Sequence, residues 1–219
     1  MSFSSTLTGQ LHSSKFTSLT SEQLTMAMIR VTDDEYMLQN HMIVDQQDDC
    51  FFKLDQHLNH LKIEESKQEE VKEGEIRSKI AVLHSRYASR KNTMRDNQAH
   101  PVFDSEKRVA VFHNGFVTNY KELAKELFPH KDPSKSNQSD SELIALMLGK
   151  LLTDGLDIKT AIKTLVETKL IGTWRMAIML KAEPNKIYVT KNAGPLYLGQ
   201  SQGQVVICSD ANILSEQSK

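Results

Sequence analysis

The stretch 109-VAVFHNGFVTNY-120 begins as an apolar run and then turns polar at His113, Asn114 and Gly115. The β-branched and aromatic residues of the run predict a buried strand. Polar side chains at the end of such a strand are typical of a binding or catalytic site. The Asn114 side-chain amide and the Gly115 backbone N–H offer donors that suit a carbonyl oxygen or a developing oxyanion. The competing interpretation is a turn pair, which is common after strands.

Strand and helix signals alternate along the chain around this stretch. Apolar and β-branched runs predict strands, and a Ser-x-x-Glu capping box at Ser139 and Glu142 marks the start of a helix. Strands are predicted at 79–89, 108–117, 173–182, 186–192, 195–201 and 204–210, and helices at 118–128, 139–155 and 157–170. Short connections between the C-terminal strands favour antiparallel pairing. Sheet segments on both sides of a group of helices indicate an α+β layered fold.

The N-terminal third carries weaker signals. Residues 1–20 are small and polar, which predicts a flexible or partner-bound arm, so the globular domain is expected to span 21–219. Apolar residues at helical spacing predict a helix over 21–31, and a short strand is predicted over 37–44. The highly charged segment 64–79 is typical of a solvated helix or loop.

The composition narrows the classes of function. The chain has 219 residues and a net charge of −1, which allows a core of its own and does not suggest a nucleic-acid partner. No apolar run approaches the roughly 20 residues that span a bilayer, so membrane insertion is not expected. The N-terminal stretch lacks the apolar core of a secretory signal, and Cys50 and Cys208 are expected to be reduced thiols. An intracellular location is therefore expected, in the cytoplasm or in an organelle such as the mitochondrion.

Three polar clusters stand at the ends of predicted elements, at residues 84–87, 113–115 and 139–142. An arginine such as Arg86 can bind a carboxylate through two parallel hydrogen bonds, and an aspartate such as Asp140 can bind an ammonium group. Together with the donors at 114 and 115, these groups describe a receptor for an amino acid whose side chain ends in a carbonyl. Taken singly, Arg86 is typical of a structural ion pair and Asp140 of helix capping.

The clusters resemble the class II glutamine amidotransferase domain, a branch of the N-terminal nucleophile hydrolases. They are most similar to the glutaminase half of glutamine–fructose-6-phosphate aminotransferase. That family's pattern reads roughly HTRWATHG, N-A-H-P, HNGIITNY and S-x-TDTE, in this order. The present chain has HSRYASRK at 84–91, NQAHP at 97–101, HNGFVTNY at 113–120 and SDSE at 139–142. The resemblance extends over residues 79–214, and loosely over 20–78, and it implies a four-layer αββα sandwich.

The resemblance also implies roles for individual residues. Arg86 matches the arginine that holds the α-carboxylate of glutamine, and Asp140 matches the aspartate that holds its α-ammonium group. Asn114 and Gly115 match the oxyanion hole. Tyr87 stands where the sugar-transferring branch has a tryptophan. No cofactor and no metal is implied, and the spacing of the histidines matches no common metal signature, so buried, hydrogen-bonded histidines are expected instead.

The chain departs from the family pattern at the nucleophile, which in the family is a cysteine that becomes the first residue. Here the sequence opens Met-Ser-Phe, Cys50 lies in an acidic turn, and Cys208 lies in a predicted strand. The family's Ala-Thr-His-Gly loop reads Ala-Ser-Arg-Lys at 88–91. We therefore expect a catalytically inactive domain, a pseudoenzyme retained as a structural or interaction subunit of a larger assembly. The alternatives are an active amide hydrolase with Ser2 as nucleophile, and a sensor that only binds glutamine.

Overall fold

The computed structural model describes residues 23–31, 36–44, 78–86, 100–132, 138–183, 185–201 and 204–216. In the first three of these segments it describes the backbone and, of the side chains, those of Val82 and His84. Several expectations fall outside the described residues: the arm at 1–20, the charged segment 64–79 up to residue 77, the loop at 88–91, and the residues Ser2, Cys50 and Tyr87.

The central sheet has the strand order β4-β5-β6-β7 and is antiparallel throughout. Its strands are β4 (Val102–Phe103), β5 (Val109–Val117), β6 (Gly172–Leu180) and β7 (Ile187–Lys191). The strands β5 and β6 pair along their whole length, so that Val109 lies opposite Leu180 and Val117 lies opposite Gly172. The predicted strand over 108–117 is confirmed, whereas the short strand β4 was not predicted from the sequence.

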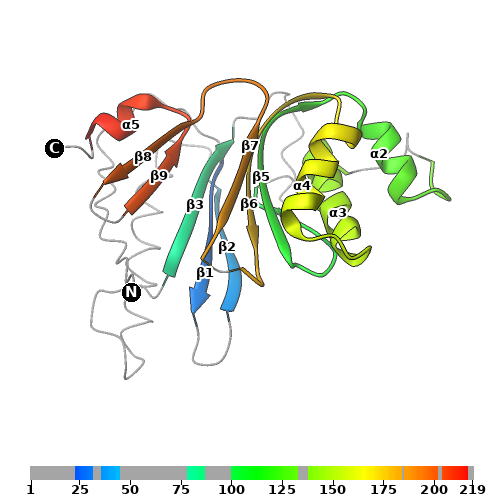
Figure 1. Ribbon diagram of the computed structural model, residues 1–219, viewed down its shortest axis with the longest axis horizontal. Helices are drawn as coiled ribbons and strands as arrows, with labels where there is room; N and C mark the ends of the chain where they lie inside the picture. Colours follow the sequence, from blue (N-terminus) through cyan, green and yellow to red (C-terminus); the bar gives the residue numbers. More distant parts are fainter. Residues whose placement is uncertain are drawn as a thin grey trace.

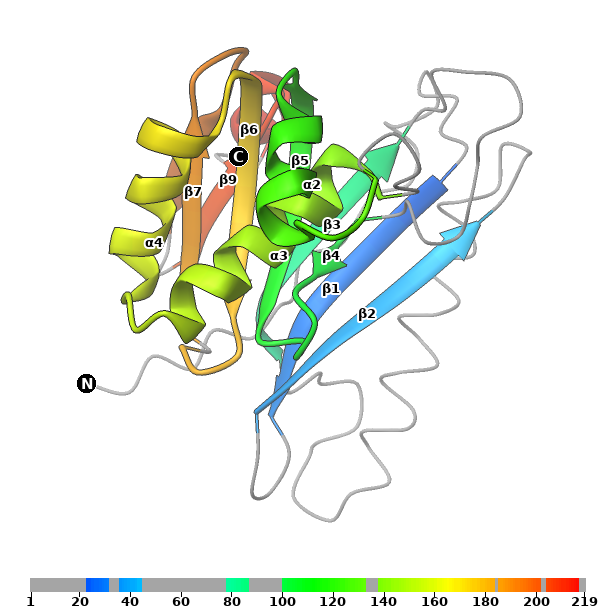
Figure 2. The same cartoon turned by 90° about the vertical axis from the view of Figure 1, so that its right-hand side faces the viewer.

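Helices cover one face of this sheet, as Figures 1 and 2 show. They are α2 (Tyr120–Leu127), α3 (Asp140–Thr153) and α4 (Ile158–Thr164), and α4 continues into a π-helical turn, η4 (Leu165–Lys169). The predicted capping box of α3 is present, because Ser139 Oγ accepts from the Glu142 N–H and Glu142 Oε2 accepts from the Ser139 N–H. The helices predicted over 118–128, 139–155 and 157–170 are therefore confirmed.

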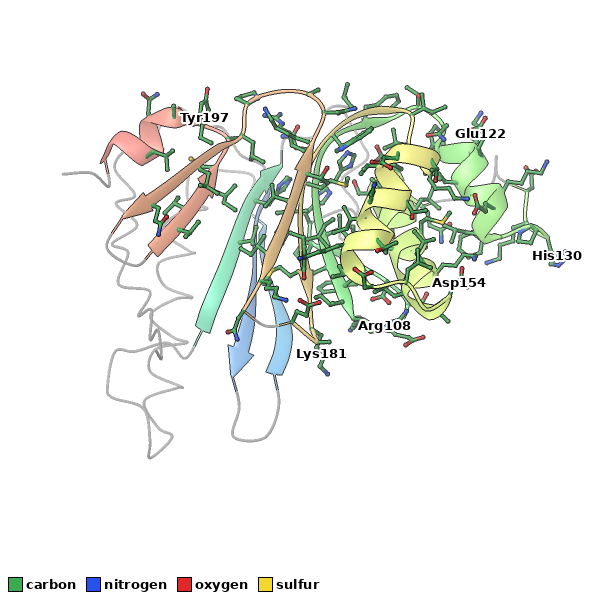
Figure 3. All side chains as sticks on the ribbon, viewed as in Figure 1. Arg108, Glu122, His130, Asp154, Lys181 and Tyr197 are labelled. Atoms are coloured by element: carbon green, nitrogen blue, oxygen red, sulfur yellow. The ribbon has the colours of Figure 1, made fainter. Side chains whose placement is uncertain are left out.

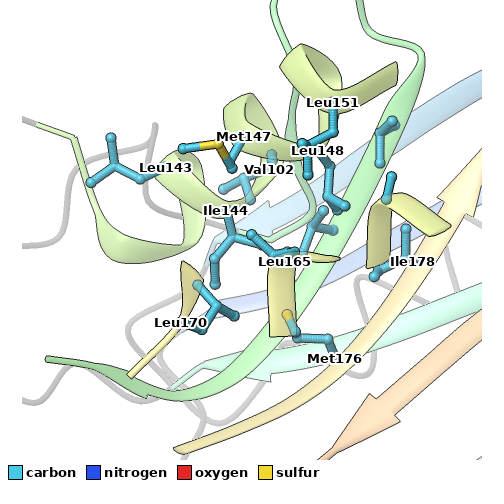
Figure 4. Close-up of a cluster of buried hydrophobic side chains, with 14 of the residues drawn as sticks. Val102, Leu143, Ile144, Met147, Leu148, Leu151, Leu165, Leu170, Met176 and Ile178 are labelled. Carbon is cyan, nitrogen blue, oxygen red and sulfur yellow. The ribbon is translucent and has the colours of Figure 1, made fainter. Parts of the chain in front are cut away.

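The hydrophobic core lies between these helices and the sheet (Figure 4). The inward face of α3 contributes fully buried Leu143, Ile144, Met147 and Leu148, and β6 contributes Ile178. Because α3 is apolar on most of its circumference, it is the central helix of the layer and packs on β4 and β5, on α2 and on α4. Burial of each such side chain contributes on the order of 1.5–3 kcal/mol.

A second sheet, in the order β2-β1-β3, faces the other side of the central sheet. It consists of β1 (Gln23–Val31), β2 (Tyr36–Val44) and β3 (Ser78–Arg86), paired antiparallel. Val82 on β3 packs against the buried side chains Ala110, Phe112 and Met179 of the central sheet, so the two sheets are in contact. Among the described residues the layers are thus helices, sheet and sheet.

The predicted helix over 21–31 is wrong, because this segment forms the strand β1. Its apolar residues Leu24, Met26 and Met28 also alternate with a period of two, which fits a strand as well as a helix. The position of β1 between β2 and β3 satisfies its backbone on both edges, and this tertiary pairing decides between the two patterns.

The C-terminal segment forms a hairpin of β8 (Tyr197–Ser201) and β9 (Gln204–Cys208), followed by the helix α5 (Ala211–Glu216). The antiparallel pairing predicted for this region is confirmed, and α5 was not predicted. The hairpin and α5 lie away from the helical layer of α2–α4 (Figure 1). In the part of the chain that the structure describes, no helix combines the length and the apolar character needed to cross a membrane.

Candidate functional site

The two glycines at the end of the β5–β6 pair are required by the close approach of the strands. A Cβ atom built on Gly115 would lie 2.1 Å from the carbonyl oxygen of Thr173, and one on Gly172 would lie 2.1 Å from that of Phe116. Real Cβ atoms do not approach a backbone oxygen so closely, so a side chain at either position would force the strands apart. Gly115 is therefore fixed by the fold, whatever its role toward a ligand.

Asn114 lies on the face of the central sheet that is turned toward the second sheet. Phe112, two residues earlier on β5, packs between the sheets, and the alternation of side chains along a strand puts Asn114 on the same face. It is exposed, so it lies at the open end of the space between the sheets. Its cross-strand neighbour on β6 is Arg175, whose Nη2 donates to Asn114 Oδ1 over 2.8 Å. Because the carbonyl oxygen of the amide is engaged, the Asn114 NH₂ group remains to donate to a ligand.

The backbone N–H of Gly115 points away from β6. Its cross-strand partner Trp174 turns its backbone N–H and carbonyl groups away from β5 and toward Asn192. The Trp174 N–H donates to Asn192 Oδ1 (2.7 Å), and the Trp174 carbonyl accepts from the Asn192 N–H (3.1 Å). Gly115 and Trp174 are thus a non-hydrogen-bonded pair of the ladder. On the opposite edge of β5, the described strand β4 pairs only with Ala110 and Val111. The Gly115 N–H therefore faces an edge that β4 leaves open.

Asp140 joins this edge of β5 to the start of α3. Its Oδ2 accepts from the Val117 N–H over 3.0 Å, and its Oδ1 accepts from the Ser141 N–H over 2.9 Å. The carboxylate lies at the N-terminus of α3, the positive end of the helix dipole. The side chain keeps 22% of its surface exposed, and a carboxylate has about four acceptor positions, so Asp140 can also accept from an ammonium group. The structural and the ligand-binding interpretations of Asp140 are thus compatible.

His113 lies beneath these groups on the helical side of β5. Its Nδ1 is hydrogen-bonded to Ser141 Oγ over 2.9 Å and lies 3.9 Å from Asp140 Oδ2. Burial lowers the pKa of His113 below its ordinary value, and the nearby Asp140 carboxylate offsets only part of this. His113 is therefore a neutral, hydrogen-bonded core histidine at neutral pH, as predicted from the sequence.

The other two histidines of the motifs lie between the sheets. The rings of His84 and His100 are 4.6 Å apart, and the His84 ring lies 6.1 Å from that of Phe112. His100 is buried and precedes a cis proline. Within the described residues, no group of three or more His, Cys, Asp or Glu side chains is arranged to hold a metal ion.

The structure thus brings Asn114, Gly115 and Asp140 to one end of β5, and their roles toward a ligand stay predictions. Arg86 ends β3 opposite Gln23 of β1, and only its backbone is described, so the prediction for its side chain and for Tyr87 stays a prediction. The contact of Arg175 with Asn114 was missed. An isolated arginine inside the apolar run 172-GTWRMAIML-180 was the signal, because a cation in a buried strand needs a partner.

Cys208 lies in the separate C-terminal hairpin. It is a free thiol, as predicted, and its Sγ contacts the carbonyl oxygen of Asp210 over 3.1 Å. Burial raises the pKa of the Cys208 thiol, so it is protonated at neutral pH.

Comparison with known proteins identifies the family of the chain. The pattern of the family described as "Glutamine amidotransferase domain" matches residues 84–216, more than half of the chain. The chain belongs to the class II glutamine amidotransferase domain family. It is 32% identical to the glutamine–fructose-6-phosphate aminotransferase of Fusobacterium nucleatum over 68% of this chain, and 33% identical to that of Methanococcus maripaludis over 64%. These segments make up 24% of each relative, so the chain spans about a quarter of the length of these amidotransferases.

Solved structures show the same fold. The structure of glutamine phosphoribosylpyrophosphate amidotransferase of Bacillus subtilis superposes with a TM-score of 0.57 and 21% sequence identity. The aligned part covers 90% of the present chain and 37% of the Bacillus subtilis chain. A structure described as the allosteric regulatory enzyme of purine biosynthesis matches 86% of the domain and 36% of its own chain, with a TM-score of 0.58 and 19% identity. The fold is therefore the α+β sandwich of the N-terminal nucleophile hydrolases.

Proposed function

We propose that this domain binds glutamine without hydrolysing it and acts as a structural or interaction subunit of a larger assembly. The observation that carries the proposal is the hydrogen bond from Arg175 to Asn114 Oδ1. It leaves the Asn114 NH₂ group, next to the edge-facing Gly115 N–H, without a hydrogen-bond partner among the described residues. These two donors suit the side-chain carbonyl of glutamine.

The rest of the proposed receptor recognises the α-carbon end of the ligand. Asp140 accepts from the α-ammonium group while it keeps its bonds to the Val117 and Ser141 N–H groups. Arg86 binds the α-carboxylate from the end of β3, and Tyr87 lines the site beside it. An amino acid held in this way presents its side-chain amide to Asn114 and Gly115.

Two features support binding without chemistry. The loop 88–91 reads Ala-Ser-Arg-Lys, whereas the active family has Ala-Thr-His-Gly, and the described cysteine, Cys208, is a protonated thiol in a separate hairpin. In addition, the fold itself requires Gly115 for the close approach of β6, and it uses Asp140 to join β5 to α3. The motif residues therefore have a structural reason to be present that does not depend on hydrolysis.

Exposed apolar side chains at the same end of the sheet support a role in assembly. Phe116 and Ile171 are 61% and 64% exposed. They belong to adjacent strand ends, since Phe116 lies opposite Thr173 and the Thr118 N–H donates to the Ile171 carbonyl oxygen over 2.8 Å. Large apolar side chains gathered at one place are typical of protein contacts. Another protein subunit is the partner that we propose.

The test combines a binding and a hydrolysis measurement on the same purified protein. Calorimetric titration with L-glutamine is expected to show saturable binding, which Asn114→Ala weakens about tenfold because the ligand carbonyl loses a hydrogen-bond donor. Asp140→Asn keeps an acceptor for the Val117 N–H but loses the charge that binds ammonium, so it should also weaken binding. Lys121→Ala, an exposed substitution on α2, is the matched control and should bind normally.

The hydrolysis arm measures ammonia release from L-glutamine under the same conditions. No release above that of buffer is expected. Release that is lost in Asn114→Ala and in Ser2→Ala would contradict the proposal and support the active hydrolase instead. Absence of any glutamine binding by the wild-type protein would remove the binding role.

A further inference from the structure

Arg175 places a cation beside the donors of the candidate site. Its Nη2 donates to Asn114 Oδ1 over 2.8 Å and its Nη1 donates to the Pro195 carbonyl oxygen over 3.3 Å. The guanidinium also lies against Gly194, where an added Cβ would stand 3.0 Å from Arg175 Cζ. These contacts hold the group between the end of β5 and the turn that follows β7.

Both oxygens that bind this guanidinium belong to neutral groups, an amide and a backbone carbonyl. Among the described residues, neither contact cancels the positive charge of the guanidinium. The guanidinium polarises the Asn114 amide, and the NH₂ group of that same amide would donate to the ligand oxygen. A positive charge near such a ligand oxygen interacts more strongly with a carboxylate than with a neutral carbonyl.

We propose that Arg175 makes the site selective for ligands whose side chain ends in a carboxylate, so that it holds glutamate in preference to glutamine. The inference rests on the proposed amino-acid site and names the charge of the ligand that the site prefers. Arg175 acts in two ways: its N–H orients the Asn114 amide, and its charge favours an anionic ligand oxygen.

Two substitutions separate these effects. Arg175→Gln retains an N–H donor for Asn114 Oδ1 and removes the charge, whereas Arg175→Met removes both. Lys191→Gln is the matched control, because Lys191 lies opposite Arg175 on β7, bears the same charge, and donates to the Gly194 carbonyl oxygen instead of Asn114. The dissociation constants for L-glutamate and L-glutamine are measured for each protein at low and at physiological ionic strength.

The wild type is expected to bind glutamate more tightly than glutamine. Arg175→Gln should weaken glutamate binding about tenfold while the affinity for glutamine changes less than about threefold. Arg175→Met should weaken both ligands, and Lys191→Gln should leave the ratio of the two affinities unchanged. Glutamate preference should also decrease as the ionic strength increases.

If the ratio of the glutamate affinity to the glutamine affinity is the same in Arg175→Gln as in the wild type, this inference is overturned. The proposed glutamine-binding function would then still stand. A glutamate preference that Lys191→Gln abolishes as strongly as Arg175→Gln would also overturn it, since the effect would then be one of general charge. Binding of neither amino acid by the wild type would overturn the proposed function and this inference together.

Discussion

At the scale of single residues, the motif His113-Asn114-Gly115 combines structural roles with the proposed ligand-binding role. His113 is buried against α3, Asn114 is held by Arg175, and Gly115 permits the approach of β6. The residue types were sufficient to predict donors at this position. The reason for the glycine was not predictable from the sequence, because it depends on the register that places Thr173 beside it.

Replacement of Gly115 by alanine should destabilise the domain strongly. The new Cβ would collide with the Thr173 carbonyl oxygen, and separation of the strands is expected to lower the free energy of unfolding by about 3 kcal/mol or more. Gly155→Ala is the control, because its φ of +92° is unfavourable for alanine but nothing lies within 4 Å of the added Cβ. A loss of about 1–2 kcal/mol is expected there. Urea unfolding of both variants measures the difference, and equal losses would refute the steric explanation.

The buried His113 should make stability depend on pH. Its pKa is lowered in the folded state, whereas the unfolded chain has the ordinary value of 6.5. The unfolded state therefore binds more protons between these two pKa values. The contribution of the neutral His113 to the free energy of unfolding is complete above about pH 6.5 and is lost as the pH falls through the folded pKa. The free energy of unfolding, measured from pH 7.5 to pH 5, should decrease less in His113→Asn than in the wild type. In the control His130→Gln, on the exposed turn after α2, the free energy of unfolding should decrease as much as in the wild type.

At the scale of elements, the helices α2–α4 and the strands β5–β9 were predictable because each has a consistent periodic pattern and clear end signals. The capping box of α3 and the apolar run of β5 are local features that the fold preserves. The segment 21–31 was assigned wrongly because its pattern fits two periods, and only pairing with β2 and β3 selects the strand. The short strand β4 has two residues, too few for a periodic signal.

A polar cluster that the sequence did not indicate joins the turn before β5 to α3. The buried Asp104 carboxylate accepts from the Arg108 and Val109 backbone N–H groups and from Arg108 Nε, at 2.6, 2.9 and 2.9 Å. Arg108 Nη2 in turn donates to the Gly149 carbonyl oxygen of α3 over 2.9 Å. Arg108 stands at the same end of the sheet as Lys181 (Figure 3), whose N–H donates to the Arg108 carbonyl oxygen over 2.8 Å.

Asp104→Ala should therefore lower the free energy of unfolding by about 3 kcal/mol, since it leaves buried donors without an acceptor. Glu106→Ala is the matched control, because Glu106 contacts the same Arg108 Nε over 3.3 Å but is exposed. A loss below about 0.5 kcal/mol is expected for it. Thermal or urea unfolding distinguishes the two, and similar losses for both would show that burial does not decide the strength of this cluster.

At the scale of the whole molecule, the sequence motifs predicted the fold family, and the alignment of Asn114, Gly115 and Asp140 at one end of β5 follows from it. The contribution of Arg175 did not follow, because it arises from the pairing of residues 61 positions apart across β5 and β6. The proposed glutamine site is the central claim at this scale. The structure describes the two donors that we propose to bind the carbonyl, whereas of Arg86, proposed to bind the carboxylate, it describes only the backbone.

The most direct measurement of this claim is a ¹H–¹⁵N correlation spectrum of the labelled protein during titration with L-glutamine. The Gly115 amide and the Asn114 side-chain NH₂ resonances report on the two proposed donors, and the Gly155 amide, at the opposite end of α3, serves as reference. We predict that the Gly115 and Asn114 signals shift together and saturate at one ligand concentration while the Gly155 signal stays in place. Gly115 and Asn114 signals that remain fixed at saturating glutamine would contradict the proposed site.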